Sequence, residues 1–191
     1  NGEKGDNPWG NDKRLRQALS YAIDREAINQ VVFNGAFAAG NQPFPPNSPW
    51  YSTDFPVPER DVEKAKELLA EAGLPDGFSV LADQSAGDYQ ASQIGWSGRV
   101  DPDGNIHQFM TSDGGINDSK FSNPEVDELL NKARKSNDQD VRRESYTAAR
   151  AILNEELPIV YLYHQTWIWA LDSGITGFTP YPDGMIRLEG M

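Results

Sequence analysis

The sequence contains no cysteine, which excludes disulfide bonds, thiolate metal ligands and cysteine nucleophiles. Basic residues are in the minority, since 17 Lys and Arg stand against 29 Asp and Glu, for a formal net charge of −12 at pH 7. An acidic surface repels phosphate backbones, so nucleic acid is not an expected partner. No apolar run approaches the roughly 20 residues that a membrane helix needs, and residues 1–10 show no signal-peptide pattern.

Residues typical of catalysis are also sparse. The two histidines, His107 and His164, are far apart and lack an HExxH context. Gly95-Trp96-Ser97-Gly98 comes nearest to a nucleophile elbow, but the residues that follow it do not predict the required helix. The segment 101–105 (DPDGN) begins like a calcium loop, but Ser112 occupies the position of the bidentate Glu. We therefore expect a turn at this segment, and neither a metal nor a cofactor.

The composition is that of a folded protein, with 38% apolar and 10% aromatic residues in a chain of ordinary domain length. Helical spacing of apolar residues predicts helices within 11–34, 61–72, 123–135 and 140–154. Asp24 is expected to cap a second helix in the first of these ranges, with Ile28, Val31 and Val32 as its apolar face. Six prolines within 40–58 predict a surface loop.

Four segments predict β-strands, namely 78–81, 90–96, 159–164 and 166–171. Trp167 and Trp169 fall on one face of the last strand, which favours core packing or an inter-lobe contact. Residues 99–115 predict a loop, and the tail from Asp172 is expected to be irregular. Because helices and strands are interspersed along the chain, the predicted fold class is α/β, with α+β as the alternative.

Seven stretches in order resemble the peptide, oligopeptide and nickel-binding class of ABC-transporter solute-binding proteins, known as family 5. Residues 11–25 (NDKRLRQALSYAIDR) are similar to the most recognisable helix of that family. The remaining stretches are 45–51 (PPNSPWY), 61–75 (DVEKAKELLAEAGLP), 87–96 (GDYQASQIGW), 121–133 (FSNPEVDELLNKA), 152–163 (ILNEELPIVYLY) and 177–188 (GFTPYPDGMIRL). Their common order makes the resemblance specific, although each stretch alone would be weak.

The resemblance implies one lobe of a two-lobed, type II periplasmic-binding-protein fold. Residues 1–10 would be a polar leader, 11–171 a partial lobe, and 172–191 a tail that in the family returns toward the other lobe. Two departures suggest a truncated chain with an internal deletion. Family members are much longer, and between the equivalents of Val80 and Gly87 they carry a strand, a helix, a strand and another helix, where this chain has only 81–86.

The resemblance also implies binding of a peptide or similar small carboxylate-bearing ligand, without catalysis, and delivery to ABC permease subunits. The protein would be periplasmic or extracellular, with a lipid anchor in a Gram-positive cell and a signal peptide outside this chain. Two alternatives remain open: a hydrolase using Asp101 and Asp103, and an interaction domain of the same fold without a transport role. A sheet edge exposed by the missing segment predicts dimer formation or strand exchange.

In the family the ligand lies in a cleft between the lobes, and the Gly-Trp strand ends at this cleft. Peptide binders usually carry an Asp shortly after that Trp, whereas Arg99 stands at this position here. A guanidinium prefers a carboxylate, although an internal pair of Arg99 with Asp101 or Asp103 is an alternative. The expected ligand-binding residues are Trp96, Ser97, Gly98, Arg99 and Asp101, with Gln42 and Trp50 at the cleft edge.

Overall fold

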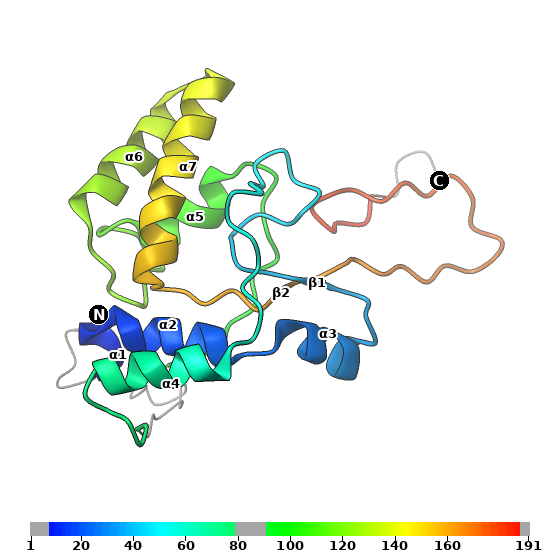
Figure 1. Cartoon of the computed structure of the whole chain (residues 1–191). Coiled ribbons are helices and arrows are strands. Elements are labelled where there is room, and N and C mark those ends of the chain that lie inside the picture. Colours follow the sequence, from blue (N-terminus) through cyan, green and yellow to red (C-terminus); the bar gives the residue numbers. More distant parts are fainter. Residues whose placement is uncertain (1–7, 79–90, 188–191) are drawn as a thin grey trace.

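The computed structural model describes residues 8–78 and 91–187 (Figure 1). Helices are the main regular structure among its described residues. The helices are α1 (Pro8–Asn11), α2 (Lys13–Ala22), α3 (Arg25–Phe33), α4 (Val62–Glu71), α5 (Asp103–Met110), α6 (Pro124–Lys135) and α7 (Gln139–Glu156), and the strands are β1 (Ala38–Ala39) and β2 (Tyr163–His164). None of these helices is both long and apolar enough to cross a membrane.

Local capping explains where the predicted helices begin and end. The side chain of Asp24 accepts a hydrogen bond from the backbone N–H of Ala27 at the start of α3, which ends at Asn34 in a left-handed conformation. Asn123 accepts from two backbone N–H groups of α6, and Pro124 follows as the first helical residue. The helix starts at Asp24 and Asn123 depend only on neighbouring residues, and both were predicted from the sequence.

Helix α5 lies within the segment 99–115 that was predicted to be a loop, so this prediction was wrong. The acidic residues that favour a turn also suit the first turn of a helix, where Asp103 lies. Ile106, Phe109 and Met110 recur at helical spacing and are buried. Burial of this apolar face stabilises the helix despite the turn-forming residues before it.

The strand predictions fared worse than the helix predictions. β1 and β2 pair antiparallel in a two-residue ladder, with Ala38 opposite His164 and Ala39 opposite Tyr163. The predicted strand 159–164 is thus reduced to its end, the described part of 90–96 and all of 166–171 form no strand, and 79–81 lies outside the described residues. A strand forms only where a neighbour satisfies its backbone groups, and these extended segments find no such neighbour in the part of the chain that is described.

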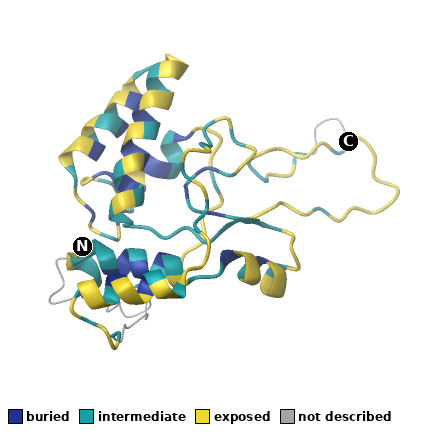
Figure 2. Ribbon diagram, in the orientation of Figure 1, coloured by how far each residue is buried: buried dark blue, intermediate teal, exposed yellow. Residues whose placement is uncertain are grey.

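The main core lies between α5, α6 and α7 (Figure 2). Its buried residues are Ile106, Phe109, Met110, Phe121, Val126, Leu130, Ala133, Tyr146, Ala149 and Leu153. A smaller cluster joins α2 to α4 through Ala18, Ala65 and Leu68. The predicted apolar face of α3 is not buried, because Val31 is 85% exposed and the helix instead buries Arg25 and Asn29.

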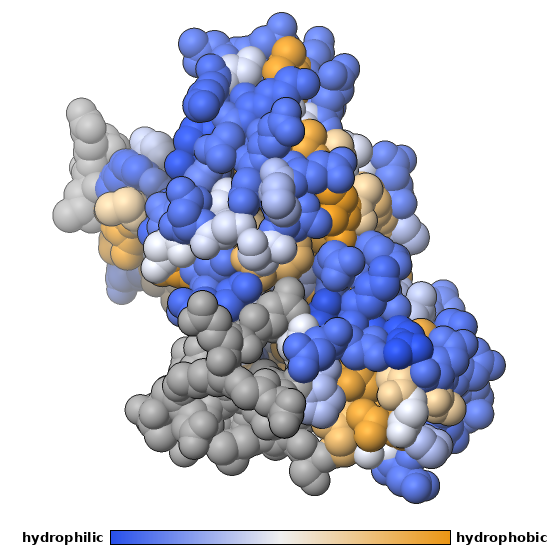
Figure 3. Space-filling view, turned by 90° about the vertical axis from the view of Figure 1, so that its left-hand side faces the viewer, coloured by the Kyte–Doolittle hydropathy of each residue, from blue (hydrophilic) through white to orange (hydrophobic). Residues whose placement is uncertain are grey.

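The face at the left of Figure 1 is mostly hydrophilic, and apolar side chains gather on it in small patches (Figure 3). A different surface is presented by residues 165–187, here called the C-terminal arm, which extends away from the helices (Figure 1). The arm is irregular from Asp172, as predicted, and its exposed apolar side chains include Trp167, Ile168, Leu171, Ile175, Tyr181, Met185 and Ile186. Trp169 contacts Trp167 and Phe178, with ring centroids 6.4 and 5.4 Å away, so the arm packs partly on itself.

Candidate functional site

The predicted ligand-binding residues Trp96 to Asp101 form an exposed turn that leads into α5. Gly98 has a φ of 75°, a conformation that glycine adopts without steric cost. The guanidinium of Arg99 lies over the Trp96 ring, 4.5 Å from its centroid, and donates to the hydroxyl of Ser97 and the carbonyl of Gly98. The structure therefore brings Trp96, Ser97, Gly98 and Arg99 together on the surface.

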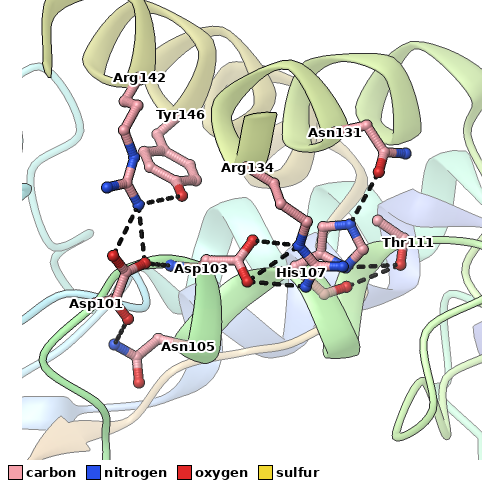
Figure 4. A network of polar contacts seen from close by, with 9 residues as sticks. All are labelled: Asp101, Asp103, Asn105, His107, Thr111, Asn131, Arg134, Arg142 and Tyr146. Carbon is pink, nitrogen blue, oxygen red and sulfur yellow. Dashed lines mark hydrogen bonds and ion pairs between the residues drawn. The ribbon is translucent and has the colours of Figure 1, made fainter. Parts of the chain in front are cut away.

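Arginines other than Arg99 pair with the two acidic residues beside this turn (Figure 4). Arg142 of α7 donates to Asp101 over 2.8 Å, and Arg134 of α6 donates to both carboxylate oxygens of Asp103 over 2.8 to 3.1 Å. The alternative that Arg99 pairs with one of these acids is therefore wrong. Arg99 is exposed and forms no ion pair with any residue in the described ranges.

The electrostatics of the two acidic residues do not suit a hydrolase. Burial raises the pKa of Asp101, but hydrogen bonds from the Arg142 side chain and the Asp103 N–H outweigh it, so this pKa lies below its ordinary value. Paired carboxyl catalysis needs one group that stays protonated as a general acid. The lowered pKa keeps Asp101 ionised at neutral pH, and both carboxylates are occupied by arginine side chains, so the geometry does not favour catalysis by this pair.

His107 has a structural place in the same region. It is buried between α5 and α6, with its Nε2 3.2 Å from Oδ1 of Asn131 and its Nδ1 3.5 Å from the hydroxyl of Thr111 (Figure 4). The contact with Asn131 ties α5 to α6. The described residues contain no group of three or more His, Asp or Glu side chains that could hold a metal ion.

The two residues expected at the cleft edge lie in the proline-rich loop. Gln42 is 0% exposed and exchanges two hydrogen bonds with the backbone of Ser52, so in this structure it fixes the loop from within. Trp50 packs edge-on against Tyr146 and lies under the guanidinium of Arg142. Since Arg142 also binds Asp101, Trp50 is connected to the exposed turn, whereas Gln42 is not brought to it.

Trp50 also lines a hollow of about 240 Å³ together with Tyr51, Asp54 and Tyr146. A larger cavity of about 420 Å³ lies between α2, the proline-rich loop and the end of α7. Arg25 lines it, but the guanidinium of Arg25 donates to the carbonyls of Gly40, Tyr161 and Ser20. These bonds occupy the guanidinium with the protein's own backbone, and burial lowers its pKa.

Sequence reasoning missed three residues that organise the turn: Arg134, Arg142 and Asn105. The two arginines looked like ordinary surface charges of amphipathic helices. Asn105 was assigned to a turn, although its side chain accepts from the N–H of Arg99 and donates to the carbonyl of Arg99. Its place nine residues after Trp96 and within an Asp-Gly-rich segment was the available signal, because Asn side chains bond nearby backbone readily.

The sequence of this chain is similar to those of known solute-binding proteins. Residues 1–82 match the family described as bacterial extracellular solute-binding proteins, family 5 Middle. Heme-binding protein A of Haemophilus influenzae is 30% identical over 230 residues, covering 96% of this chain and 42% of the relative. The dipeptide-binding protein of Escherichia coli is 26% identical over 227 residues, covering 94% of this chain and 42% of the relative.

Solved structures agree with these sequence relatives. HbpA2 from Haemophilus parasuis has a TM-score of 0.80 at 25% identity, covering 94% of this chain and 45% of its own. A dipeptide-binding protein from Pseudoalteromonas in complex with Met-Leu has a TM-score of 0.70 at 26% identity, covering 81% of this chain and 40% of its own. The fold is therefore that of part of a type II periplasmic binding protein, and the chain spans less than half the length of these relatives.

Proposed function

Since this chain belongs to the family-5 bacterial extracellular solute-binding proteins, we propose that it is part of a binding component of an ABC importer. The whole protein binds a peptide or a similar small carboxylate-bearing ligand, without catalysis, and delivers it to permease subunits. It acts in the periplasm or outside the cell, with a lipid anchor if the cell is Gram-positive. Relatives named for binding heme and dipeptides support a binding role and leave the class of ligand broad.

Arg99 is the observation that carries the carboxylate assignment. Its guanidinium is exposed, held over Trp96, and free of any ion pair with the described residues, while Arg142 and Arg134 neutralise the nearest acids. A guanidinium can hold a carboxylate through two parallel hydrogen bonds. In this proposal Trp96, Ser97 and Gly98 surround the bound carboxylate.

The other predicted residues act further from the ligand in this proposal. Asp101 ties the turn to α7 through Arg142. Trp50 supports Arg142 from the other side, and Gln42 fixes the loop that carries Trp50. The second wall of the binding cleft comes from the other lobe, which family members carry in their longer chains.

Calorimetric titration with Met-Leu and with its C-terminal amide tests the assignment, because the two probes differ only in the carboxylate. Arg99→Ala should abolish the preference for the free acid, whereas the control Lys135→Ala removes an exposed charge elsewhere and should keep it. An exposed pair contributes about 0–1 kcal/mol. In a full-length protein with both lobes, where the pair is buried, the loss should be about 2–5 kcal/mol.

A preference for the acid that survives in Arg99→Ala would refute the assignment.

The two-lobed cleft is tested by comparing this chain with a full-length protein. This chain alone should bind the probe much more weakly than a full-length protein does, because one wall leaves the ligand half solvated and association still costs about 4 kcal/mol or more. Equal dissociation constants would place recognition entirely on this lobe.

We also propose that the chain lacks an internal stretch near 81–86. The matches to relatives extend over 230 and 227 residues, which exceeds the 191 residues of this chain, so the relatives carry positions that this chain does not have. Residues 81–86 themselves lie outside the described ranges. Inserting the corresponding stretch of the E. coli dipeptide-binding protein should increase the strand signal in circular dichroism, and an unchanged spectrum would argue against the deletion.

Self-association is a third proposal, supported by the exposed apolar side chains of the C-terminal arm. Extended segments without neighbours can pair between two copies by dimer formation or strand exchange. Sedimentation velocity should show dimers at high concentration, and Ile168→Glu should reduce them. A strictly monomeric profile of the unaltered chain would contradict this proposal.

A further inference from the structure

The side chain of Asn105, in the first turn of α5, is fully engaged by the exposed turn before it. Its Oδ1 accepts the backbone N–H of Arg99 over 2.7 Å and the indole N–H of Trp96 over 3.1 Å. Its Nδ2 donates to the carbonyl of Arg99 over 2.7 Å. The same nitrogen donates to the carbonyl of Asp101 over 3.4 Å (Figure 4). One amide therefore holds both backbone groups of Arg99 and the ring on which the guanidinium lies.

An asparagine is the residue that fits this pattern. The amide combines an oxygen with two lone pairs and a nitrogen with two donated hydrogens, and all four positions are used here. Aspartate could accept the two N–H groups but could not donate to the two carbonyls. Alanine would leave the two N–H groups and the two carbonyls without a hydrogen-bond partner at residue 105.

Gly104 provides a second and independent observation at the same place. A Cβ atom at this position would lie 2.9 Å from Cγ and 3.0 Å from Cβ of Arg99. These separations are too short for carbon atoms, so the stem of Arg99 reaches α5 only because residue 104 has no side chain. Gly104 leaves space for the side-chain stem of Arg99, and Asn105 holds the Arg99 backbone by hydrogen bonds.

The first turn of α5, which carries Asn105, is held in place by further contacts. Asp103 is bound to Arg134 of α6, and Ile106, the residue after Asn105, is buried in the core. The ion pair between Asp101 and Arg142 holds the end of the turn against α7. Asn105 therefore connects an exposed binding turn to a rigid part of the molecule.

From this geometry we propose that Asn105 is a positioning residue that preorganises Trp96 and Arg99 for a ligand carboxylate, with Gly104 providing the necessary space. The inference rests on the proposed role of Arg99 in ligand binding. Without the amide, the turn and the long Arg99 side chain populate many conformations, and the apparent affinity falls by the fraction that is competent to bind. A competent fraction of about one tenth weakens binding about tenfold.

The indole N–H of Trp96 provides a readout that does not depend on any ligand. In ¹⁵N NMR spectra of the full chain, this signal is assigned by its loss in Trp96→Phe. Its hydrogen bond to Asn105 should slow its exchange with water. Asn105→Ala should speed the exchange and move the signal toward that of a free indole, whereas Gln108→Ala, an exposed control on the same helix, should leave it unchanged. An unchanged signal in Asn105→Ala overturns the proposal.

Titration of the same variants with Met-Leu connects positioning to binding. In a full-length protein with both lobes, Asn105→Ala should weaken binding about tenfold, toward the level of Arg99→Ala, while Gln108→Ala should leave binding unchanged. In this chain alone the loss should be no larger than that of Arg99→Ala. Asn105→Asp should keep the Trp96 signal, since it retains the acceptor, and still weaken binding through the charge that it places beside Arg99. Gly104→Ala should weaken binding by displacing the stem of Arg99.

The outcomes separate this inference from the proposed function. If Arg99→Ala weakens binding and Asn105→Ala does not, the positioning role is wrong and the role of Arg99 stands. If Asn105→Ala releases Trp96 but neither variant changes binding, both the role of Arg99 and the positioning role fall. Circular dichroism that shows intact helices in each variant excludes unfolding as the cause.

Discussion

Two regions of this chain differ in how far they bury their apolar side chains. In the bundle of α5, α6 and α7, apolar side chains such as Leu130 and Val126 are completely buried. In the C-terminal arm, side chains of the same kind, such as Ile168 and Met185, are mostly exposed. A helix satisfies its backbone hydrogen bonds within its own segment and then needs only one face covered, whereas an extended segment needs a neighbouring chain for both.

The ladder between β1 and β2 marks the boundary between the two regions. It ends at His164, and the chain beyond it has no strand partner among the described residues. The bundle should therefore fold and melt as a cooperative unit, while the arm should contribute little to stability until a partner covers it. Substitutions in each region can break or sharpen this contrast.

The largest difference is expected for truncated apolar side chains. Leu130→Ala, at a position that is 0% exposed, should lower the free energy of unfolding by about 2–5 kcal/mol. Ile168→Ala, at a position that is 73% exposed, should change it by less than about 0.5 kcal/mol. Urea unfolding followed by helical circular dichroism measures both, and comparable losses would show that the arm is part of the folded unit.

A gain in stability is expected from the removal of a buried charge in the bundle. Arg150 is 1% exposed, burial lowers its pKa to about 10, and its Nε and Nη2 atoms have no hydrogen-bond partner within the described residues. Arg150→Met keeps an unbranched apolar stem and removes the desolvated charge, so unfolding should cost about 1 kcal/mol more. The control Arg142→Met, which breaks the pair with Asp101, should instead destabilise, and equal losses in both variants would contradict this account.

Loss of a helix cap should have an effect of similar size and opposite sign. Asn123→Ala removes the acceptor for two N–H groups at the start of α6 and should cost about 1 kcal/mol in thermal or urea unfolding. Asn123→Asp preserves the acceptor and should restore most of the loss. If alanine and aspartate were equally tolerated, the packing of α6 against α7 alone would set its stability.

The smallest effect on stability is expected in the arm, where pH can be used as a probe. The side-chain hydrogen bond from Arg187 lowers the pKa of Asp183 to about 2. Because this pKa is lowered, the contact is complete above the ordinary pKa of the carboxyl and is lost as pH falls through about 2. Carboxyl ¹³C NMR should show this low titration, and Arg187→Ala should raise it, with no change in the unfolding of the bundle.

How well the sequence predicted a structural feature depended on how far apart in the sequence the interacting residues lie. Helix ends at Asp24 and Asn123 could be read from the sequence, because a cap involves residues two or three positions apart. The strands could not, since segments such as 166–171 have the residues of a strand but no partner to pair with in the described part of the chain. Helix α5 was missed because its start has the composition of a turn and its stability depends on burial against α6 and α7.

The candidate site shows the same division. The order of seven motifs determined the family, and the position of Arg99 after Gly95-Trp96 determined which charge stands at the turn. Only the tertiary structure decided that Asp101 and Asp103 belong to Arg142 and Arg134 and leave Arg99 without an acidic partner in the described ranges. The reason is geometric, because ion pairs form within about 4 Å, and the packing of α5 against α6 and α7 sets those distances across 31 and 41 positions of sequence.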